Sequence, residues 1–338
     1  MNDLAAIVNT ARVLMSNPKG LLAMDESTPT CNKRFAKYGI AQTPEMRRDY
    51  RELIVTTPGL SQFISGAILY DETVRQYSES GRSLLKLIIE TGIIPGIKVD
   101  SGAVDLAGFP GEKITEGLDG LRERLGNYAG MGLRFAKWRA VIKIENGIPT
   151  NSCIKANNHA LARYAALCQE AGLLPIVEPE VLMDGSHSMQ ECGEVTESVL
   201  KDLFFQLYKE RVNIEGIILK PNMVLPGLDN AVQNGVDDVA EATVNCLRRC
   251  VPAAVAGVAF LSGGQPGKLA SSRLNLMHSK FRSTLPWPLT FSFSRTIQLP
   301  ALEIWKGKDA NKSEAQKMLL YQAQCNSQAR RGIYSDTL

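Results

Sequence analysis

The chain has 338 residues, of which 44% are hydrophobic and 22% are charged, and its 38 basic and 35 acidic residues give a formal net charge of +3. This composition is ordinary for a globular enzyme, and the length suits one large domain or two smaller ones. Because the charges are so nearly balanced, we expect neither nucleic acid nor an anionic membrane surface as a partner.

The N-terminal segment is typical of an amphipathic helix and lacks the basic, apolar and cleavage regions of a signal peptide. No apolar run is long enough to cross a membrane. The seven cysteines are scattered and form no CxxC pair, which favours free thiols in a reducing compartment. We therefore expect a cytoplasmic protein, although a mature organelle protein without its transit peptide would look the same.

Short apolar runs recur along the chain, and their interiors are continuously apolar, as in parallel strands that helices cover on both faces. The predicted strands are residues 20–26, 63–70, 93–100, 135–144, 174–181, 214–221, 254–263 and 289–295. Segments with helical spacing lie between them, at 82–92, 159–172, 194–211 and 236–250. This alternation predicts an α/β fold, the (β/α)8 TIM barrel, as a single domain over residues 1–338. We expect an N-terminal helix before it and a flexible C-terminal tail from about residue 326.

The segment "GIILKPNMVLPG", residues 216–227, places a lysine where a buried strand ends. Pro221 cannot continue an α-helix, and it biases Lys220 towards an extended backbone. A lysine at such a position is either a cation with a buried apolar stem or an amine that is kept from water for its chemistry. Both interpretations are open at this point.

Charged residues also stand at the ends of other predicted strands, where a barrel carries its active site. The charged residues of this group are Asp25, Glu26, Lys98, Asp100, Lys137, Arg139, Glu178, Glu180, Lys220 and Arg295. Lys137 and Arg139 are two residues apart on one strand, so both are expected to point into the barrel mouth, as are Glu178 and Glu180. Such charges can simply pair with one another, but their number at one end of the barrel favours a charged ligand.

The last two predicted strands indicate a phosphate site. "LSGGQPGKLASS" is a Gly-rich turn that leads into a helix, and Arg295 ends the next strand. The backbone N–H groups of Gly263 and Gly264 can approach a phosphate because no Cβ intervenes. The turn is not a Walker A loop, because Ser262 stands where that motif needs its first glycine.

Metal ligands are not grouped in the sequence. His159, His187 and His278 are far apart, and Cys246 and Cys250, four residues apart on a predicted helix, are more typical of plain packing. We therefore expect a mechanism without a metal ion and without another cofactor.

Seven segments together resemble one family. "LLAMDEST", "GIKVD", "FAKWR", "PIVEPEVLMDG", "LKPNMVLPG", "FLSGGQ" and "FSFSRTIQ" closely resemble the motifs of class I fructose-1,6-bisphosphate aldolase, in the family's order, from about residue 20 to about residue 300. The resemblance implies a (β/α)8 barrel, usually a homotetramer, that uses no metal. It also implies reversible cleavage of fructose 1,6-bisphosphate to dihydroxyacetone phosphate and glyceraldehyde 3-phosphate.

The resemblance also implies catalytic roles. The lysine that forms a Schiff base with the ketone corresponds to Lys220, and partial burial and neighbouring Lys137 should both disfavour its charged form. Asp25 would handle the proton of the C4 hydroxyl, and Glu178 would be the general acid and base of imine formation and hydrolysis. Glu180 would tune Lys220, and Lys137 would stabilise the charge that develops near C4.

Two phosphate-binding groups follow from the same motifs. The C1 phosphate would be held by Ser262, Gly263, Gly264 and Arg295. The C6 phosphate or its neighbouring hydroxyls would be held by Thr30, Lys33, Lys98 and Arg139. The expected ligands are thus a sugar bisphosphate and triose phosphates.

Three positions depart from the family pattern or deserve separate mention. The family usually has glycine where this chain has Ser294, whose N–H can still donate to phosphate but whose side chain is expected to narrow the pocket. Pro29 is expected to stiffen the loop after the first strand. Tyr334, four residues from the end, corresponds to a terminal tyrosine that speeds proton exchange on the enamine, or it has no role at all.

Other functions are compatible with part of this pattern. A Schiff-base aldolase that acts mainly on sedoheptulose 1,7-bisphosphate or another sugar phosphate would carry the same residues, and relative cleavage rates would separate it from an enzyme for fructose 1,6-bisphosphate. A metal-dependent aldolase would lose activity to a chelator. A barrel that serves only as a binding scaffold would have lost its chemical groups first, yet Asp25, Lys137, Glu178 and Lys220 are all present.

Overall fold

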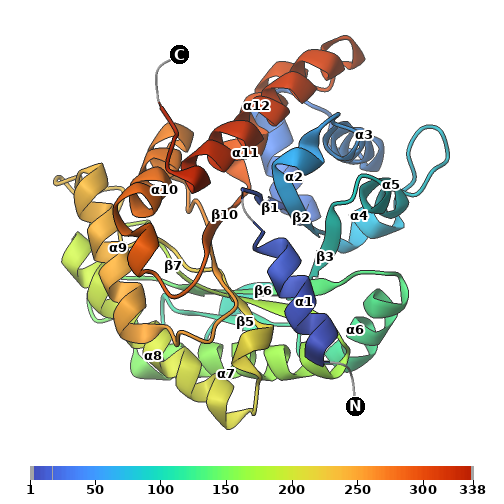
Figure 1. Cartoon of the computed structure of the whole chain (residues 1–338). Coiled ribbons are helices and arrows are strands. Elements are labelled where there is room, and N and C mark those ends of the chain that lie inside the picture. The colour runs from blue at the N-terminus through green and yellow to red at the C-terminus, as the bar shows by residue number, and fades with distance from the viewer. Residues whose placement is uncertain (1–3, 17, 336–338) are drawn as a thin grey trace.

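Eight parallel strands close into a barrel in the structure, which is a computed structural model that describes residues 4–16 and 18–335. The order around the barrel is β1-β10-β9-β8-β7-β6-β3-β2, and Figure 1 shows the helices outside it. The strands are β1 (Gly20–Met24), β2 (Ile64–Leu69), β3 (Ile94–Lys98), β6 (Phe135–Ile142), β7 (Leu174–Val181), β8 (Ile218–Leu219), β9 (Val258–Phe260) and β10 (Leu289–Phe293). The predicted barrel is confirmed.

The helices surround the barrel and begin and end for local reasons. They are α1 (Leu4–Leu14), α2 (Thr28–Lys37), α3 (Pro44–Val55), α4 (Asp71–Arg75), α5 (Leu84–Glu90), α6 (Leu121–Gly130), α7 (Asn151–Glu170), α8 (Met189–Lys209), α9 (Val236–Cys250), α10 (Gly267–Phe281), α11 (Arg295–Trp305) and α12 (Lys312–Arg331). A capping box of Ser188 and Glu191 starts α8. Acidic residues begin α9 and arginines end it, which complements the helix dipole. None of the described helices is long and apolar enough to cross a membrane.

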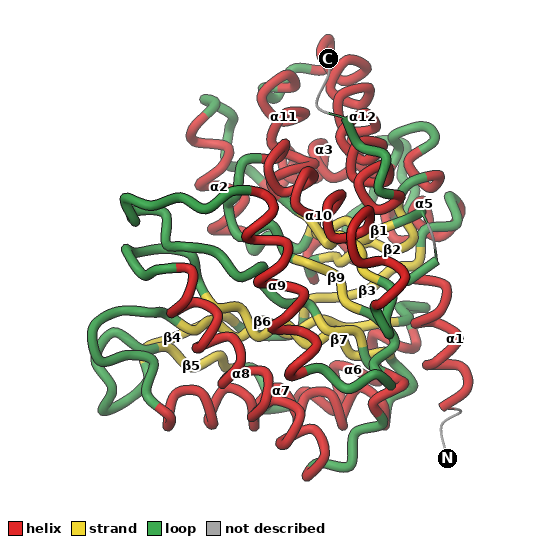
Figure 2. The backbone as a smooth tube through the Cα atoms, turned by 60° about the vertical axis from the view of Figure 1, so that its left-hand side comes forward, coloured by secondary structure: helices red, strands yellow, loops and turns green. Residues whose placement is uncertain are grey.

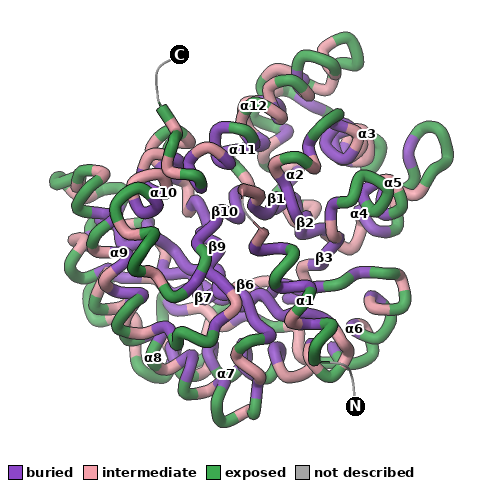
Figure 3. Tube along the Cα trace, in the orientation of Figure 1, coloured by how far each residue is buried: buried purple, intermediate pink, exposed green. Residues whose placement is uncertain are grey.

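Two hydrophobic layers hold the barrel. The larger layer lies between the strands and the surrounding helices, and Figure 3 shows the strands as its buried centre. The smaller layer fills the barrel, where Phe135 and Ile176 meet Ile7, Ala11 and Leu14 of α1. Figure 2 shows α1 at one end of the barrel and the β4–β5 hairpin at the other. Helix α1 therefore closes the amino-terminal end, and the opposite end is left for the site.

Close backbone approach inside the barrel explains one glycine. At Gly96 of β3, an added Cβ would overlap the Phe135 ring on neighbouring β6. Glycine is therefore required there to let an aromatic ring fill the barrel interior.

The structure also differs from the predicted elements. Strand β8 has only two residues, because Ile214–Gly216 form a 3-10 turn, and Arg295 begins α11 rather than ending β10. An antiparallel hairpin of β4 (Gly102–Asp105) and β5 (Lys113–Glu116) follows β3 and was not predicted. Its strands are largely exposed, so they lack the apolar pattern by which the other strands are recognised.

Two further expectations about chain segments need correction. Pro29 lies in the first turn of α2, where its missing N–H would be unpaired anyway, and not in a loop. Helix α12 continues to Arg331, beyond residue 326 where the tail was expected to begin, because Ala329 and Arg330 are buried. The guanidinium of Arg330 donates to the carbonyl groups of Met15, Ser16 and Lys19, which fixes this helix end against the chain before β1.

Candidate active site

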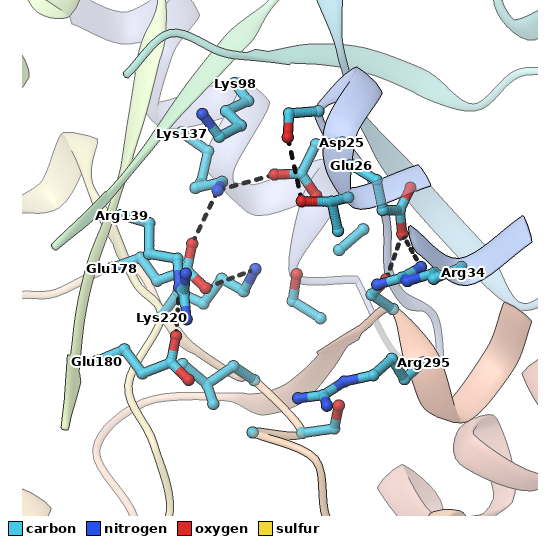
Figure 4. A pocket seen from close by; sticks show the side chains of 18 of the residues that line it. Asp25, Glu26, Arg34, Lys98, Lys137, Arg139, Glu178, Glu180, Lys220 and Arg295 are labelled. Carbon is cyan, nitrogen blue, oxygen red and sulfur yellow. Dashed lines mark hydrogen bonds and ion pairs between the residues drawn. The ribbon is translucent and has the colours of Figure 1, made fainter. Parts of the chain in front are cut away.

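A cavity of about 440 Å³ opens at the carboxyl-terminal end of the barrel, and Figure 4 shows the charged side chains that line it. It brings together every residue predicted for the site except Gly264 and Tyr334. The predicted residues that line it are Asp25, Thr30, Lys33, Lys98, Lys137, Arg139, Glu178, Glu180, Lys220, Ser262, Gly263, Ser294 and Arg295. Residues from seven separate segments of the chain thus meet in one cavity because parallel strands end at one rim.

Two lysines and two carboxylates form a continuous chain of ion pairs at the floor of this cavity. Lys137 Nζ lies 2.8 Å from Asp25 Oδ2 and 3.1 Å from Glu178 Oε2, and Lys220 Nζ lies 3.0 Å from Glu178 Oε1. Figure 4 shows Lys137 between the two carboxylates. Two amino groups and two carboxyl groups alternate along this chain, so opposite charges can compensate one another within the buried cluster.

Protonation within the cluster follows from these contacts. Burial alone would raise the pKa of Asp25, but the charges of Lys137 and Lys220 lower it to about 2. Burial opposes the charge of Lys137, but the carboxylates of Asp25 and Glu178 outweigh it and raise the pKa of Lys137. Asp25 is therefore an anion near neutral pH, and Lys137 is a cation.

The backbone around Lys220 is held although the strand has ended. The N–H of Lys220 donates to the carbonyl oxygen of Val177 on β7 at 2.8 Å, and the carbonyl oxygen of Pro221 accepts from Leu261 N–H at 3.1 Å. The side chain of Lys220 is only 4% exposed. Of the two interpretations of this lysine, the structure excludes a cation whose ammonium group reaches open water.

Two further ion pairs line the wall of the cavity. Glu180 on β7 pairs with Arg139 Nε on β6. Burial alone would lower the pKa of Arg139, but the carboxylate of Glu180 outweighs it and raises that pKa. Lys98 Nζ lies 2.5 Å from Asp100 Oδ1. Glu180 was predicted to tune Lys220, but its ion pair is with Arg139, and the ion pair of Lys220 is with Glu178. Its influence on Lys220 stays a prediction.

The predicted phosphate loop lies beside Arg295. Gly263 and Gly264 have φ angles of 59° and 99°, which non-glycine residues rarely adopt. A Cβ on Gly264 would lie 3.0 Å from Arg295 Nη2, so this glycine makes room for the guanidinium although it does not itself line the cavity. Burial and the nearby charge of Arg34 lower the pKa of Arg295. An anion bound beside Arg295 would relieve this repulsion.

One cationic face of α2 was only partly predicted. Thr30 and Lys33 were expected in the site, and Arg34 and Lys37 line the cavity as well. These four positions are spaced i, i+3, i+4 and i+7, so they share one face of a helix. That spacing is visible in the sequence, and together with a helix after Pro29 it indicates Arg34 and Lys37 as well.

Ser294 does more than narrow the cavity. Its Oγ donates to Glu26 Oε1 at 2.5 Å and accepts from Arg34 Nη2 at 3.3 Å and from Gln298 Nε2 at 3.1 Å. Glu26, which was placed at a strand end but given no role, also pairs with Arg34. The hydroxyl group therefore joins α2 to the start of α11 at the rim of the cavity.

Tyr334 and the histidines lie elsewhere among the described residues. Tyr334 packs on the hydrophobic layer outside the barrel, its N–H donates to Asn275 Oδ1 at 2.8 Å, and it is not among the residues that line the cavity. Its role in proton exchange stays a prediction and would require its segment to move. His159 is exposed. In the described part of the chain, no three His, Cys, Asp or Glu side chains are grouped as a metal site would need.

Comparisons with known proteins agree with this geometry. The family model "Fructose-bisphosphate aldolase class-I" matches residues 6–338. A probable fructose-bisphosphate aldolase class 1 of Xanthomonas campestris is 53% identical over 96% of this chain and 97% of its own length. The cytosolic fructose-bisphosphate aldolase 4 of Arabidopsis thaliana is 47% identical over 97% of this chain and 83% of its own length.

A solved structure is also closely similar. The fructose-bisphosphate aldolase of Plasmodium falciparum, crystallised with TRAP and a small-molecule inhibitor, superposes with a TM-score of 0.97 at 45% identity, over 99% of this chain and 96% of that one. Both the backbone and most of the sequence therefore match the same group of enzymes. From the barrel, the cluster of paired charges at its mouth and these matches, it follows that the chain belongs to the class I fructose-bisphosphate aldolase family, whose members are carbon–carbon lyases.

Proposed function

We propose that this chain cleaves fructose 1,6-bisphosphate reversibly to dihydroxyacetone phosphate and glyceraldehyde 3-phosphate, through a Schiff base on Lys220. The observation that carries the proposal is the buried Lys220 amine with Glu178 Oε1 3.0 Å away. Such an amine is screened from water and has a proton acceptor at hydrogen-bonding distance, which are the two conditions for attack on a ketone.

The first half of the reaction uses Glu178. Lys220 loses a proton to this carboxylate and attacks C2 of the sugar, which forms a carbinolamine. Glu178 then returns a proton to the departing hydroxyl group, and water leaves to give the protonated imine. The other carboxylate oxygen of Glu178 lies 3.1 Å from Lys137 Nζ, so the charge of Lys137 lies close to the group that exchanges protons.

Cleavage uses the other end of the cluster. The protonated imine withdraws electrons from the C3–C4 bond as Asp25 accepts the proton of the C4 hydroxyl group. Because Asp25 is ionised and Lys137 is protonated near neutral pH, each is in the form that this step needs. The aldehyde leaves, the enamine takes a proton at C3, and water hydrolyses the imine to release the second product.

The two phosphates are assigned to the two cationic groups of the cavity. Ser262, the Gly263–Gly264 turn and Arg295 suit the C1 phosphate, because backbone N–H groups and a guanidinium can converge on one anion. The cationic face of α2, with Lys98 and Arg139, suits the C6 phosphate. Lys220 lies in the same cavity as both sets of cationic residues. The ketone carbon lies between the two phosphate-bearing ends of the sugar, so the lysine that attacks it must share a cavity with both phosphate sites.

The experiment that tests the proposal is borohydride trapping with dihydroxyacetone phosphate, followed by peptide mass mapping. We expect a stable adduct on Lys220 that is absent in Lys220→Ala. A matched control is Lys280→Ala, which removes an exposed lysine on α10 and should leave trapping unchanged. If no adduct formed while cleavage persisted and a chelator abolished it, the Schiff-base mechanism would be wrong.

Family membership also supports two finer proposals, a homotetramer and a cytoplasmic location. Native mass spectrometry should give about four times the chain mass of 37.0 kDa. A mass of one or two chains at micromolar concentration would contradict the tetramer. Cell fractionation should recover the aldolase activity with cytoplasmic markers, and recovery with an organelle marker would contradict the location.

A further inference from the structure

Ser294 is the residue of the cavity that the family pattern does not explain, since glycine is usual at this position. Its Oγ uses its full hydrogen-bonding capacity, as it donates to Glu26 and accepts from Arg34 and Gln298. None of these bonds caps α11, although Ser294 is its N-cap residue. The Ser294 side chain therefore connects α11 to Glu26 and to Arg34 of α2, and it does not cap its own helix.

The connection is anchored on a buried side chain. Gln298, which is fully buried, donates to Glu26 Oε1 at 2.9 Å and to the carbonyl oxygen of Ala23 at 2.6 Å. Its own oxygen accepts from the Tyr50 hydroxyl at 3.2 Å. Glu26 and Ser294 thus meet a group that cannot rotate freely, so the position of the Ser294 hydroxyl is well defined.

The group that this connection fixes is the guanidinium of Arg34. One of its terminal nitrogens pairs with Glu26, and the other donates to Ser294 Oγ. Two directed bonds from one planar group set its orientation, whereas a single ion pair would leave it free to rotate about the carboxylate. Without the hydroxyl group, Arg34 would keep its charge compensation but lose its second anchor.

Arg34 and Arg295 belong to the two different sets of residues that are assigned to the two phosphates of the sugar. Arg34 shares a face of α2 with Thr30 and Lys33, on the side assigned to the C6 phosphate, and Arg295 belongs to the C1 side. Ser294 directly precedes Arg295 in the chain. A bond from Ser294 to Arg34 therefore relates the two phosphate sites to each other through a short, defined path.

We propose that Ser294 is a positioning residue that sets the span between the two phosphate sites and so favours bisphosphates over monophosphates of the same sugar. The inference rests on the proposed function. The hydroxyl group bonds to Glu26, Arg34 and Gln298, so it acts on the substrate site through Arg34. The backbone N–H of Ser294, which can face the C1 phosphate, is unaffected by changes to the side chain.

The test compares Ser294→Ala with the unchanged chain on fructose 1,6-bisphosphate and on fructose 1-phosphate, which lacks the C6 phosphate. We expect KM for the bisphosphate to rise about three- to tenfold, as for the loss of one or two hydrogen bonds. We expect KM for fructose 1-phosphate to rise less than about twofold, because Arg34 has no phosphate to hold there.

Two further variants separate positioning from a general structural effect. Thr296→Val is the matched control, because the Thr296 hydroxyl is buried two residues further along and has no hydrogen-bond partner among the described residues. It should change neither KM. In an Arg34→Lys background, Ser294→Ala should raise KM for the bisphosphate by less than about twofold, because its target is gone.

The outcomes are distinct. An equal rise of KM for both substrates, no rise for either, or a full effect of Ser294→Ala in the Arg34→Lys background would overturn the inference. If the unchanged chain cleaved neither sugar and formed no adduct on Lys220, the proposed function itself would have failed. If trapping and cleavage were normal and only the substrate ratio failed to move, the failure would belong to Ser294 alone.

Discussion

Replacing Asp25 with asparagine should destabilise the protein in a strictly pH-dependent way. The pKa of Asp25 lies at about 2 in the folded chain, against an ordinary value of 3.8. Each pKa unit corresponds to about 1.4 kcal/mol, so the ionised carboxylate contributes on the order of 2 kcal/mol to folding at neutral pH. Asparagine is similar in shape but uncharged, so it would leave the buried charges of Lys137 and Lys220 facing Glu178 alone.

The sign of the pH dependence follows from the lowered pKa. Stability from Asp25 is fully present above the unfolded value and is lost as the pH falls through the folded value. The gap between the original chain and Asp25→Asn should therefore be largest above about pH 5 and close between about pH 4 and pH 2. Asparagine has no charge to titrate, so its own stability lacks this component.

Urea unfolding at a fixed protein concentration, followed by tryptophan fluorescence at several pH values, measures this gap. Asp105→Asn is a suitable control, because Asp105 is exposed and its ion pair with Lys113 should contribute little at any pH. A gap that stays constant from neutral to acidic pH would refute the reasoning. So would a more stable Asp25→Asn at neutral pH, since it would mean that this cluster of ion pairs is not a favourable arrangement.

Three other variants test separate parts of the site and fold. Lys137→Met should lower kcat by about a hundred- to thousandfold. It should still form the borohydride adduct, because imine formation uses Glu178. Loss of the adduct would contradict the assignment of Lys137 to the cleavage step. Glu180→Gln should raise KM for the bisphosphate by releasing Arg139 but leave the rate of adduct formation unchanged, whereas a slower rate would restore the tuning role. Gly96→Ala should cost about 1–3 kcal/mol of stability by overlapping Phe135, measured as a lower Tm, and an added Phe135→Leu should recover part of it.

Much of the site was predictable because a parallel barrel converts chain order into convergence. Strand ends can be recognised from apolar runs that stop at a charge, and the fold brings all such ends to one rim. Asp25, Lys137, Glu178 and Lys220 were found in this way and lie within one set of ion pairs. The prediction of the site did not depend on exact strand lengths. The backbone N–H of Lys220 still bonds to the carbonyl oxygen of Val177 on β7, although β8 has already ended.

Pairing between side chains was less predictable, because periodicity gives the face of a strand but not the reach of a side chain. The register sets Arg139 opposite Glu178, yet the guanidinium pairs with Glu180, two residues further along β7. A long side chain spans that offset easily, and the shorter Lys220 amine takes Glu178. The role of Glu180 in tuning Lys220 stays a prediction, and the ion pair that Glu180 makes with Arg139 was not predicted.

Segments without an apolar pattern were also hard to predict. The β4–β5 hairpin is stabilised by its own backbone pairing and is largely exposed. Helix α2 was hidden by Pro29, which usually ends helices but is well accepted in a first turn. Arg34 was missed for that reason, and with it the hydrogen bond to Ser294.

Helix α1 gives the barrel a closed floor, and this has a consequence for the order of events during turnover. Ile7, Ala11 and Leu14 pack against the apolar interior of the barrel, so the cavity is closed at its amino-terminal end. Among the described residues, this packed interior separates Lys220 from the amino-terminal end of the barrel. In the proposed reaction, an aldehyde fragment at the open end would keep water from the imine, and its departure would admit the water that releases the second fragment. The aliphatic side chains of α1 at the amino-terminal end of the barrel would thus help to set the order of the chemical steps at the opposite end.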